Sequence, residues 1–142
     1  MLVSQGFDTM RLPGARDVVA PDGSDVRILL RLPGGSMAHF EMAAGQTSGA
    51  VAHRTVDEIW YVLTGRGQMW RRDRGSEREE TVELSPGICL SIPVGTCFQF
   101  RASPDGPLAV VCVTMPPWPG EDEAFEVPGA WSPGAWLPGG TA

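Results

Sequence analysis

The chain has 142 residues, enough for one domain with one core, and its 18 glycines and 13 prolines favour short elements over long helices. Its formal net charge of -6 makes nucleic acid a poor partner, since binding to phosphates requires clustered cations. The three cysteines form no C-x-x-C pair, which argues against a zinc ribbon or a disulfide framework and favours reduced thiols in the cytoplasm.

The expected strands follow an irregular N-terminal segment at 1–25. Alternating polarity and β-branched or aromatic residues mark each strand, and glycine or proline turns separate them. Strands are predicted at 25–32, 36–44, 58–65, 65–72, 79–87 and 107–115. The segment 88–102 is predicted to form two short strands that meet at a hinge at 93–95. A series of short strands without a helical period is typical of antiparallel sandwiches and barrels. We therefore predict an all-β, single-domain antiparallel β-barrel at 26–115.

The chain from 116 to 142 changes character and is expected to be a Pro/Gly/Trp-rich C-terminal arm. The tetrapeptide Pro-Gly-Ala-Trp occurs twice in it, at 128–131 and at 133–136. The arm either wraps the barrel through Trp118, Trp131 and Trp136 or is a partly mobile linker. Exposed tryptophan is costly, so docking is favoured. Two roles remain open, a lid over a barrel mouth and part of a dimer interface, and we favour the interface.

Two blocks of glycine, proline and polar positions occur at fixed spacing in the chain. The first contains Gly45, five residues, Val51-Ala52-His53, four residues, Glu58, six residues and Gly65. The second contains Gly87, five residues, Pro93-Val94-Gly95, two residues and Phe98. In this spacing the chain resembles the cupin superfamily, and among its members the small single-domain, cupin_2-like barrels, over roughly residues 26–115. The resemblance implies a jelly-roll barrel whose inward side chains hold a metal through three histidines and one glutamate.

Carried over residue by residue, the metal-ligand positions of the resemblance fall on Val51, His53, Glu58 and Phe98. Valine and phenylalanine have no lone pair to donate, and a mononuclear site usually takes at least three protein ligands. The metal motif is therefore degenerate in this chain, and we expect no cofactor. A divalent metal held by His53 and Glu58 is kept as the alternative.

His53 and Glu58 are the candidate catalytic residues, because the barrel would place both in one apolar cavity. A neighbouring carboxylate would raise the pKa of the histidine and fix its tautomer, which suits proton transfer. The competing interpretation is a buried hydrogen bond with a structural role only.

The wall of that cavity is predicted from strand periodicity, because residues two apart on a strand share a face. Together with the second block, this periodicity gives a substrate-binding wall of Val51, Trp60, Val62, Phe98 and Phe100. The alternative is a barrel that these same side chains fill completely.

Three other side chains are out of phase with their inward neighbours and are predicted to face away from the cavity: His39, Tyr61 and Cys97. This phase argues against His39 as a third metal ligand. It also argues against Tyr61, the only tyrosine, as a general acid.

Three functions remain open from the sequence. The first is binding of a small organic molecule, with proton-transfer chemistry such as isomerisation, cyclisation or elimination. The second is a metal-dependent oxygenase or isomerase with a reduced ligand set, and the third is a non-catalytic ligand-binding protein. The resemblance implies a homodimer. The sequence shows neither a signal-peptide pattern nor an apolar stretch of about 20 residues, so we expect no membrane association and a cytoplasmic location.

Overall fold

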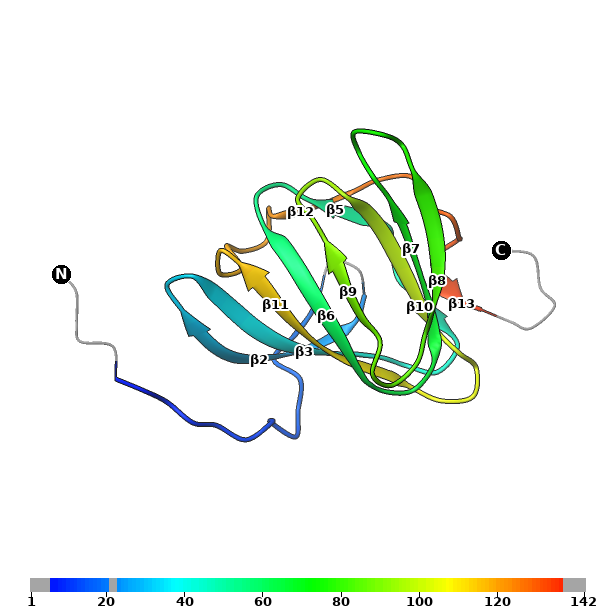
Figure 1. Cartoon of the computed structure of the whole chain (residues 1–142). Coiled ribbons are helices and arrows are strands. Elements are labelled where there is room, and N and C mark those ends of the chain that lie inside the picture. The colour runs from blue at the N-terminus through cyan, green and yellow to red at the C-terminus, as the bar shows by residue number, and fades with distance from the viewer. Residues whose placement is uncertain (1–5, 21–22, 137–142) are drawn as a thin grey trace.

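The chain forms two antiparallel sheets that pack face to face as a flattened barrel (Figure 1). The computed structural model describes residues 6–20 and 23–136, and every regular element in this part of the chain is a β-strand. The first sheet has the order β1-β2-β3-β11-β6-β9. Its strands are β1 (Val18–Val19), β2 (Asp25–Leu32), β3 (Gly35–Met42), β6 (Asp57–Thr64), β9 (Cys89–Ile92) and β11 (Leu108–Met115).

The second sheet has the order β12-β5-β10-β4-β13, and β10 also pairs with β7, which pairs with β8. Its strands are β4 (Gln46–Thr47), β5 (Val51–His53), β7 (Gly67–Arg72), β8 (Glu79–Leu84), β10 (Cys97–Ala102), β12 (Ala124–Glu126) and β13 (Gly134–Ala135). The predicted all-β antiparallel fold is therefore confirmed. In residues 6–20 and 23–136 no helix has the length and apolar character required to cross a bilayer.

The long strands lie close to their predicted positions, whereas five short strands were not expected. Each of the five has two or three residues: β1, β4, β5, β12 and β13. A segment this short contains no full period of alternation, so its strand character comes from the neighbouring strand with which it pairs.

Alternation along β6 places its side chains on two faces, as predicted. Glu58, Trp60 and Val62 are buried, whereas Ile59 and Tyr61 are exposed. The Trp60 ring packs edge-on against Phe rings of both sheets and is fully buried. Burying a large apolar side chain contributes about 1.5–3 kcal/mol, so this face of β6 is a main source of the stability of the barrel.

Gly65, at the end of the first motif block, shows why that block is tied to the fold. Its backbone has φ +86°, and a Cβ there would lie 2.1 Å from the carbonyl oxygen of Pro107. Only glycine combines this left-handed conformation with so close an approach of two chain segments. The motif spacing therefore records where the strands of the barrel must turn.

Residues 116–136 of the C-terminal arm pack on the barrel of the same chain, and residues 137–142 lie outside the described part of the structure. β12 extends the second sheet at one edge by pairing with β5, and β13 extends it at the other by pairing with β4. Between them, the buried amide of Gln99 binds the arm backbone: its oxygen accepts from the N–H groups of Ala130 (3.0 Å) and Trp131 (2.9 Å). Its nitrogen donates to the Trp131 carbonyl at 2.7 Å.

The Pro-Gly-Ala-Trp repeat forms a clamp around one arginine. The guanidinium carbon of Arg101 lies 4.0 Å from the ring centroid of Trp131 and 3.7 Å from that of Trp136. Each repeat thus supplies one aromatic face to the same cation, a contact that contributes about 0.5–2 kcal/mol. The expected docking of the arm is found within one chain, and its role in a dimer stays a prediction.

Candidate functional site

A cavity of about 550 Å³ opens into the barrel between the two sheets. Its volume is in the range of small-molecule sites. Most of its wall is apolar, from strands of both sheets and from the segment that joins β11 to β12. The apolar residues of the wall include Phe40, Val51, Phe98 and Trp118, and its polar residues include Ser36, His53, Glu58 and Thr114.

His53, the last residue of β5, is enclosed by aromatic rings. Its side chain is 5% exposed, and its ring packs edge-on against Phe98 at 5.2 Å and Trp118 at 5.1 Å between centroids. Its Nδ1 atom is buried and finds no hydrogen-bond partner among the described residues. Burial lowers the pKa of His53 from 6.5 to about 4, and the negative charge of Glu123 offsets only part of this effect. The predicted rise of this pKa is therefore wrong, because the loss of hydration outweighs the attraction of the Glu123 carboxylate.

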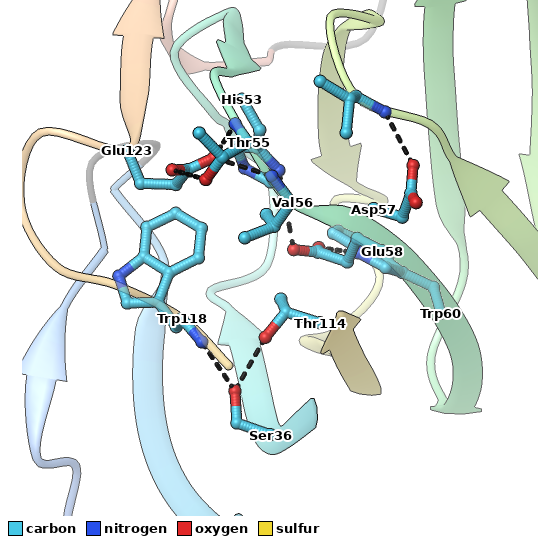
Figure 2. Close-up of polar contacts among 11 residues, drawn as sticks. Ser36, His53, Thr55, Val56, Asp57, Glu58, Trp60, Thr114, Trp118 and Glu123 are labelled. Carbon is cyan, nitrogen blue, oxygen red and sulfur yellow. Dashed lines mark hydrogen bonds and ion pairs between the residues drawn. The ribbon is translucent and has the colours of Figure 1, made fainter. Parts of the chain in front are cut away.

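Glu58 lies beside His53 on the adjacent strand β6, and its side chain is 2% exposed. One carboxylate oxygen, Oε2, accepts a hydrogen bond from the indole N–H of Trp60. The other, Oε1, lies 3.9 Å from His53 Nδ1, which is too long for a hydrogen bond. The structure thus brings the predicted pair together at the cavity (Figure 2), with a gap between the two polar atoms that a third group can fill.

The predicted substrate-binding wall divides into two sets. Val51 and Phe98 line the cavity and are directly paired across β5 and β10. Trp60, Val62 and Phe100 also point inward, but they lie in the closed, fully packed part of the core. Of these three, Trp60 contacts two residues that line the cavity: its ring packs against Phe98, and its indole N–H donates a hydrogen bond to Glu58.

The donor set at this site does not fit a mononuclear metal. At two of the four ligand positions of the resemblance stand Val51 and Phe98, which pack against each other. In residues 6–20 and 23–136 there is no group of three or more histidine, cysteine, aspartate or glutamate side chains that could hold an ion. His53 and Glu58 alone supply fewer ligands than such a site requires.

A hydrogen-bonded chain that the sequence did not reveal positions Trp118 at the cavity wall. The hydroxyl groups of Ser36 and Thr114 are 2.7 Å apart, and the Trp118 backbone N–H donates to Ser36 Oγ at 3.0 Å. Figure 2 shows the Trp118 ring between this chain and His53. Ser36 could have been found from its phase with Phe40 on β3, but no pattern places Trp118, which follows two prolines in a segment without a period.

Glu123 joins the segment that carries Trp118 to the loop between β5 and β6. Its carboxylate accepts from Thr55 N–H and Thr55 Oγ1, both at 2.6 Å, and from Val56 N–H at 3.0 Å. Burial would raise the pKa of Glu123, but these hydrogen bonds outweigh burial and lower it. This contact lies next to His53 and was also not predicted, because it depends on β12 pairing with β5.

The three side chains predicted to face outward do so. His39 pairs with Val111 on the outer face of the first sheet, where it is nevertheless buried, at 5% exposure, beside Arg27. Tyr61 is 49% exposed on the same outer face. Cys97 packs in a second small cluster between the second sheet and the arm. None of the three lines the cavity.

Comparison with known proteins identifies the fold. Residues 38–114 match the family model described as Cupin domain. The chain is 30% identical over 109 residues to the uncharacterized protein MJ1618 of Methanocaldococcus jannaschii, and the match covers 73% of this chain and 82% of that protein. Its structure is similar to KdgF from Halomonas sp., with a TM-score of 0.62, 20% identity, and coverage of 77% of this chain and 94% of that one.

CapF from Staphylococcus aureus, a capsular polysaccharide assembling protein, is also similar, with a TM-score of 0.65, 18% identity and coverage of 84% of this chain. The chain spans 35% of the length of CapF. At these identities the structural likenesses show the fold and do not transfer an activity. The family match covers more than half of the residues, and the motif spacing, the barrel and the relatives agree: the chain belongs to the cupin domain family.

Proposed function

We propose that this cupin binds a small organic molecule in the barrel cavity and moves a proton on it through His53 and Glu58. The observation that carries the proposal is the cavity of about 550 Å³, mostly apolar, in which an unpartnered His53 Nδ1 lies 3.9 Å from a Glu58 oxygen. A largely apolar pocket with a few convergent polar groups is the usual form of a small-molecule site.

The geometry suits transfer of a proton between two positions of a ligand. An atom placed about 2.8 Å from both His53 Nδ1 and Glu58 Oε1 fits across their 3.9 Å separation. Because the pKa of His53 is lowered to about 4, its imidazole is neutral near pH 7 and available as a base. The carboxyl group of Glu58 is the second proton carrier, which supports isomerisation, cyclisation or elimination as the reaction class.

A non-catalytic ligand-binding protein is the second candidate. It is favoured by the hydrogen bond that already engages one oxygen of Glu58 with the Trp60 indole, since this contact gives Glu58 a structural role in the cavity wall. Both candidates share the ligand cavity and differ only in whether the polar pair exchanges protons with the ligand.

Ligand screening followed by isotope exchange separates these candidates. A panel of small apolar alcohols, phenols and carbonyl compounds is screened by thermal shift, and each binder is then followed by NMR in D2O for protein-dependent exchange of its C–H groups. We expect exchange with the wild type, loss of exchange in His53→Phe and Glu58→Gln, and normal exchange in His39→Phe, which changes the other histidine on the outer face. Binding without exchange supports the second candidate, and failure of the whole panel to bind contradicts both.

We also propose that two copies pair through the outer face of the first sheet. Met37, Ile59, Tyr61 and Leu63 on this face are between 39% and 49% exposed. A twofold axis would bring this apolar face against itself and bury it. Light scattering is expected to show a dimer that Tyr61→Glu converts to a monomer and that Val94→Glu, an exposed change in the turn between β9 and β10, leaves intact. A wild-type monomer, or a Tyr61→Glu dimer, would contradict this interface.

The thiols support a reducing compartment such as the cytoplasm, which we propose as the location. Cys89, Cys97 and Cys112 form no disulfide with one another, and the last two are buried. Reduced cysteines are typical of cytosolic proteins. Thiol labelling immediately after cell lysis is expected to give three reactive groups in the unfolded chain, and fewer would contradict the proposal.

A further inference from the structure

We infer that the group which enters the cavity most deeply is an uncharged hydroxyl on an apolar skeleton, and that Glu58 is the residue that excludes carboxylates. This inference rests on the proposed function, because it concerns the same cavity. It follows from the unpartnered Nδ1 atom of His53 in the cavity and from the acidic side chain buried at the inner end.

The two polar atoms at the inner end match a hydroxyl. His53 Nδ1 is buried and lacks a hydrogen-bond partner among the described residues, and Glu58 Oε1 lies 3.9 Å away. A neutral imidazole nitrogen either donates or accepts, whereas a carboxylate oxygen accepts. A hydroxyl both donates and accepts, so one oxygen serves both residues whichever ring nitrogen carries the proton.

The other polar groups of the inner wall are already engaged with each other. The hydroxyls of Ser36 and Thr114 share a hydrogen bond, and Ser36 also accepts the Trp118 backbone N–H. A buried polar atom without a partner costs about 1–3 kcal/mol. A ligand hydroxyl at His53 removes that cost, and an apolar group of the same shape does not.

The charges that line the cavity disfavour an anion at its inner end. Glu58 is the acidic side chain buried at the inner end, at 2% exposure, whereas Arg31 and Glu121 are exposed residues at the rim. His53 supplies no positive charge near pH 7, because burial lowers its pKa to about 4. A ligand carboxylate placed there would lose its hydration in an apolar cavity, beside an acidic group and without a cation to pair with.

Three probes with one skeleton test this inference by calorimetry near pH 7: 2-naphthol, 2-methylnaphthalene and 2-naphthoate. In the wild type we expect 2-naphthol to bind at least about threefold more tightly than 2-methylnaphthalene, and at least about tenfold more tightly than 2-naphthoate. In Glu58→Gln, which keeps an oxygen for the Trp60 indole, the preference for 2-naphthol over 2-naphthoate is expected to shrink at least about fivefold. Glu126→Gln, an exposed change of equal charge on β12, is expected to leave the preference unchanged.

Each outcome has a separate meaning. If 2-naphthoate binds the wild type as tightly as 2-naphthol, the inference is overturned while the proposed cavity function stands. If 2-methylnaphthalene binds the wild type as tightly as 2-naphthol, the hydroxyl makes no hydrogen bond with His53 and the inference is likewise overturned. If none of the probes binds, the proposed function itself fails. The wild-type ranking does not depend on the variants, so a poorly folded Glu58→Gln protein leaves the test intact.

Discussion

Acid is expected to destabilise the folded chain through His53, in a pH window that the structure defines. The pKa of His53 is lowered from 6.5 to about 4 in the fold because of burial. Between these two values the unfolded chain binds a proton that the folded chain does not bind, so stability falls as the pH falls through the window. The loss is about 2.5 kcal/mol at about pH 4.5, a large part of the stability of a typical domain.

The comparison of wild type with His53→Phe isolates this loss. Phenylalanine preserves an aromatic ring against Phe98 and Trp118 and removes both nitrogens. Urea unfolding at about pH 7.5 and about pH 4.5 gives the change in unfolding free energy for each protein. We expect the wild type to lose about 2.5 kcal/mol more than the variant between these two conditions.

Titrating groups that do not interact with His53 cancel in that difference. The pKa of His39 is also lowered, mainly by burial, so His39 destabilises in the same direction, but it is present in both proteins. Glu123, whose folded pKa is lowered despite its burial, loses its contribution only as the pH falls below about 4.5. Equal losses in the two proteins would show that His53 is not a buried neutral imidazole. A smaller loss in the wild type would instead support the charged His53–Glu58 pair that the sequence suggested.

Two further substitutions test the contacts that hold the cavity wall and the arm. Glu123→Gln replaces one of two accepting oxygens and is expected to lower the unfolding free energy by about 1–3 kcal/mol in urea titrations. Glu121→Gln, in the same segment, is expected to change it by less than about 0.5 kcal/mol. Equal effects of the two substitutions would contradict the role given to Glu123. Gly129→Ala would place a Cβ 2.5 Å from the side-chain oxygen of Gln99 and is expected to cost about 1–3 kcal/mol and to speed limited proteolysis of the arm. Gly106→Ala, where nothing lies within 4 Å, is its control, and a Gly129→Ala protein as resistant as this control would refute the packing argument.

The fold could be predicted from the sequence because its turns require particular residue types, above all glycine. Gly65 is required by a positive φ and by the approach of Pro107, and such positions recur at spacings set by strand length. The two faces of β6 were equally readable, since burial alternates from Glu58 onward. These features depend on local conformation and on a period of two, both of which a single sequence shows.

The electrostatics of the site and its closing wall could not be predicted in the same way. The direction of the His53 pKa depends on how much water surrounds the ring, and Phe98 and Trp118 come to it from distant parts of the chain. Trp118 and Glu123 lie in a segment without a period, which is positioned by the pairing of β12 with β5. Such placement depends on tertiary packing and leaves no local pattern.

The residues that remove the metal site are also those that set the chemistry of His53. Val51 and Phe98 stand where the resemblance places two metal-binding histidines, and with Trp118 they enclose the remaining imidazole in apolar groups. A charged imidazole is disfavoured in such surroundings, so His53 is neutral near pH 7. A histidine that binds a metal must also be neutral, so the low pKa does not by itself distinguish the two roles. The Nδ1 atom of His53 is therefore available for a hydrogen bond with a ligand. With Val51 and Phe98 at two of the four ligand positions, His53 and Glu58 suit the proposed apolar ligand with one hydroxyl better than an ion.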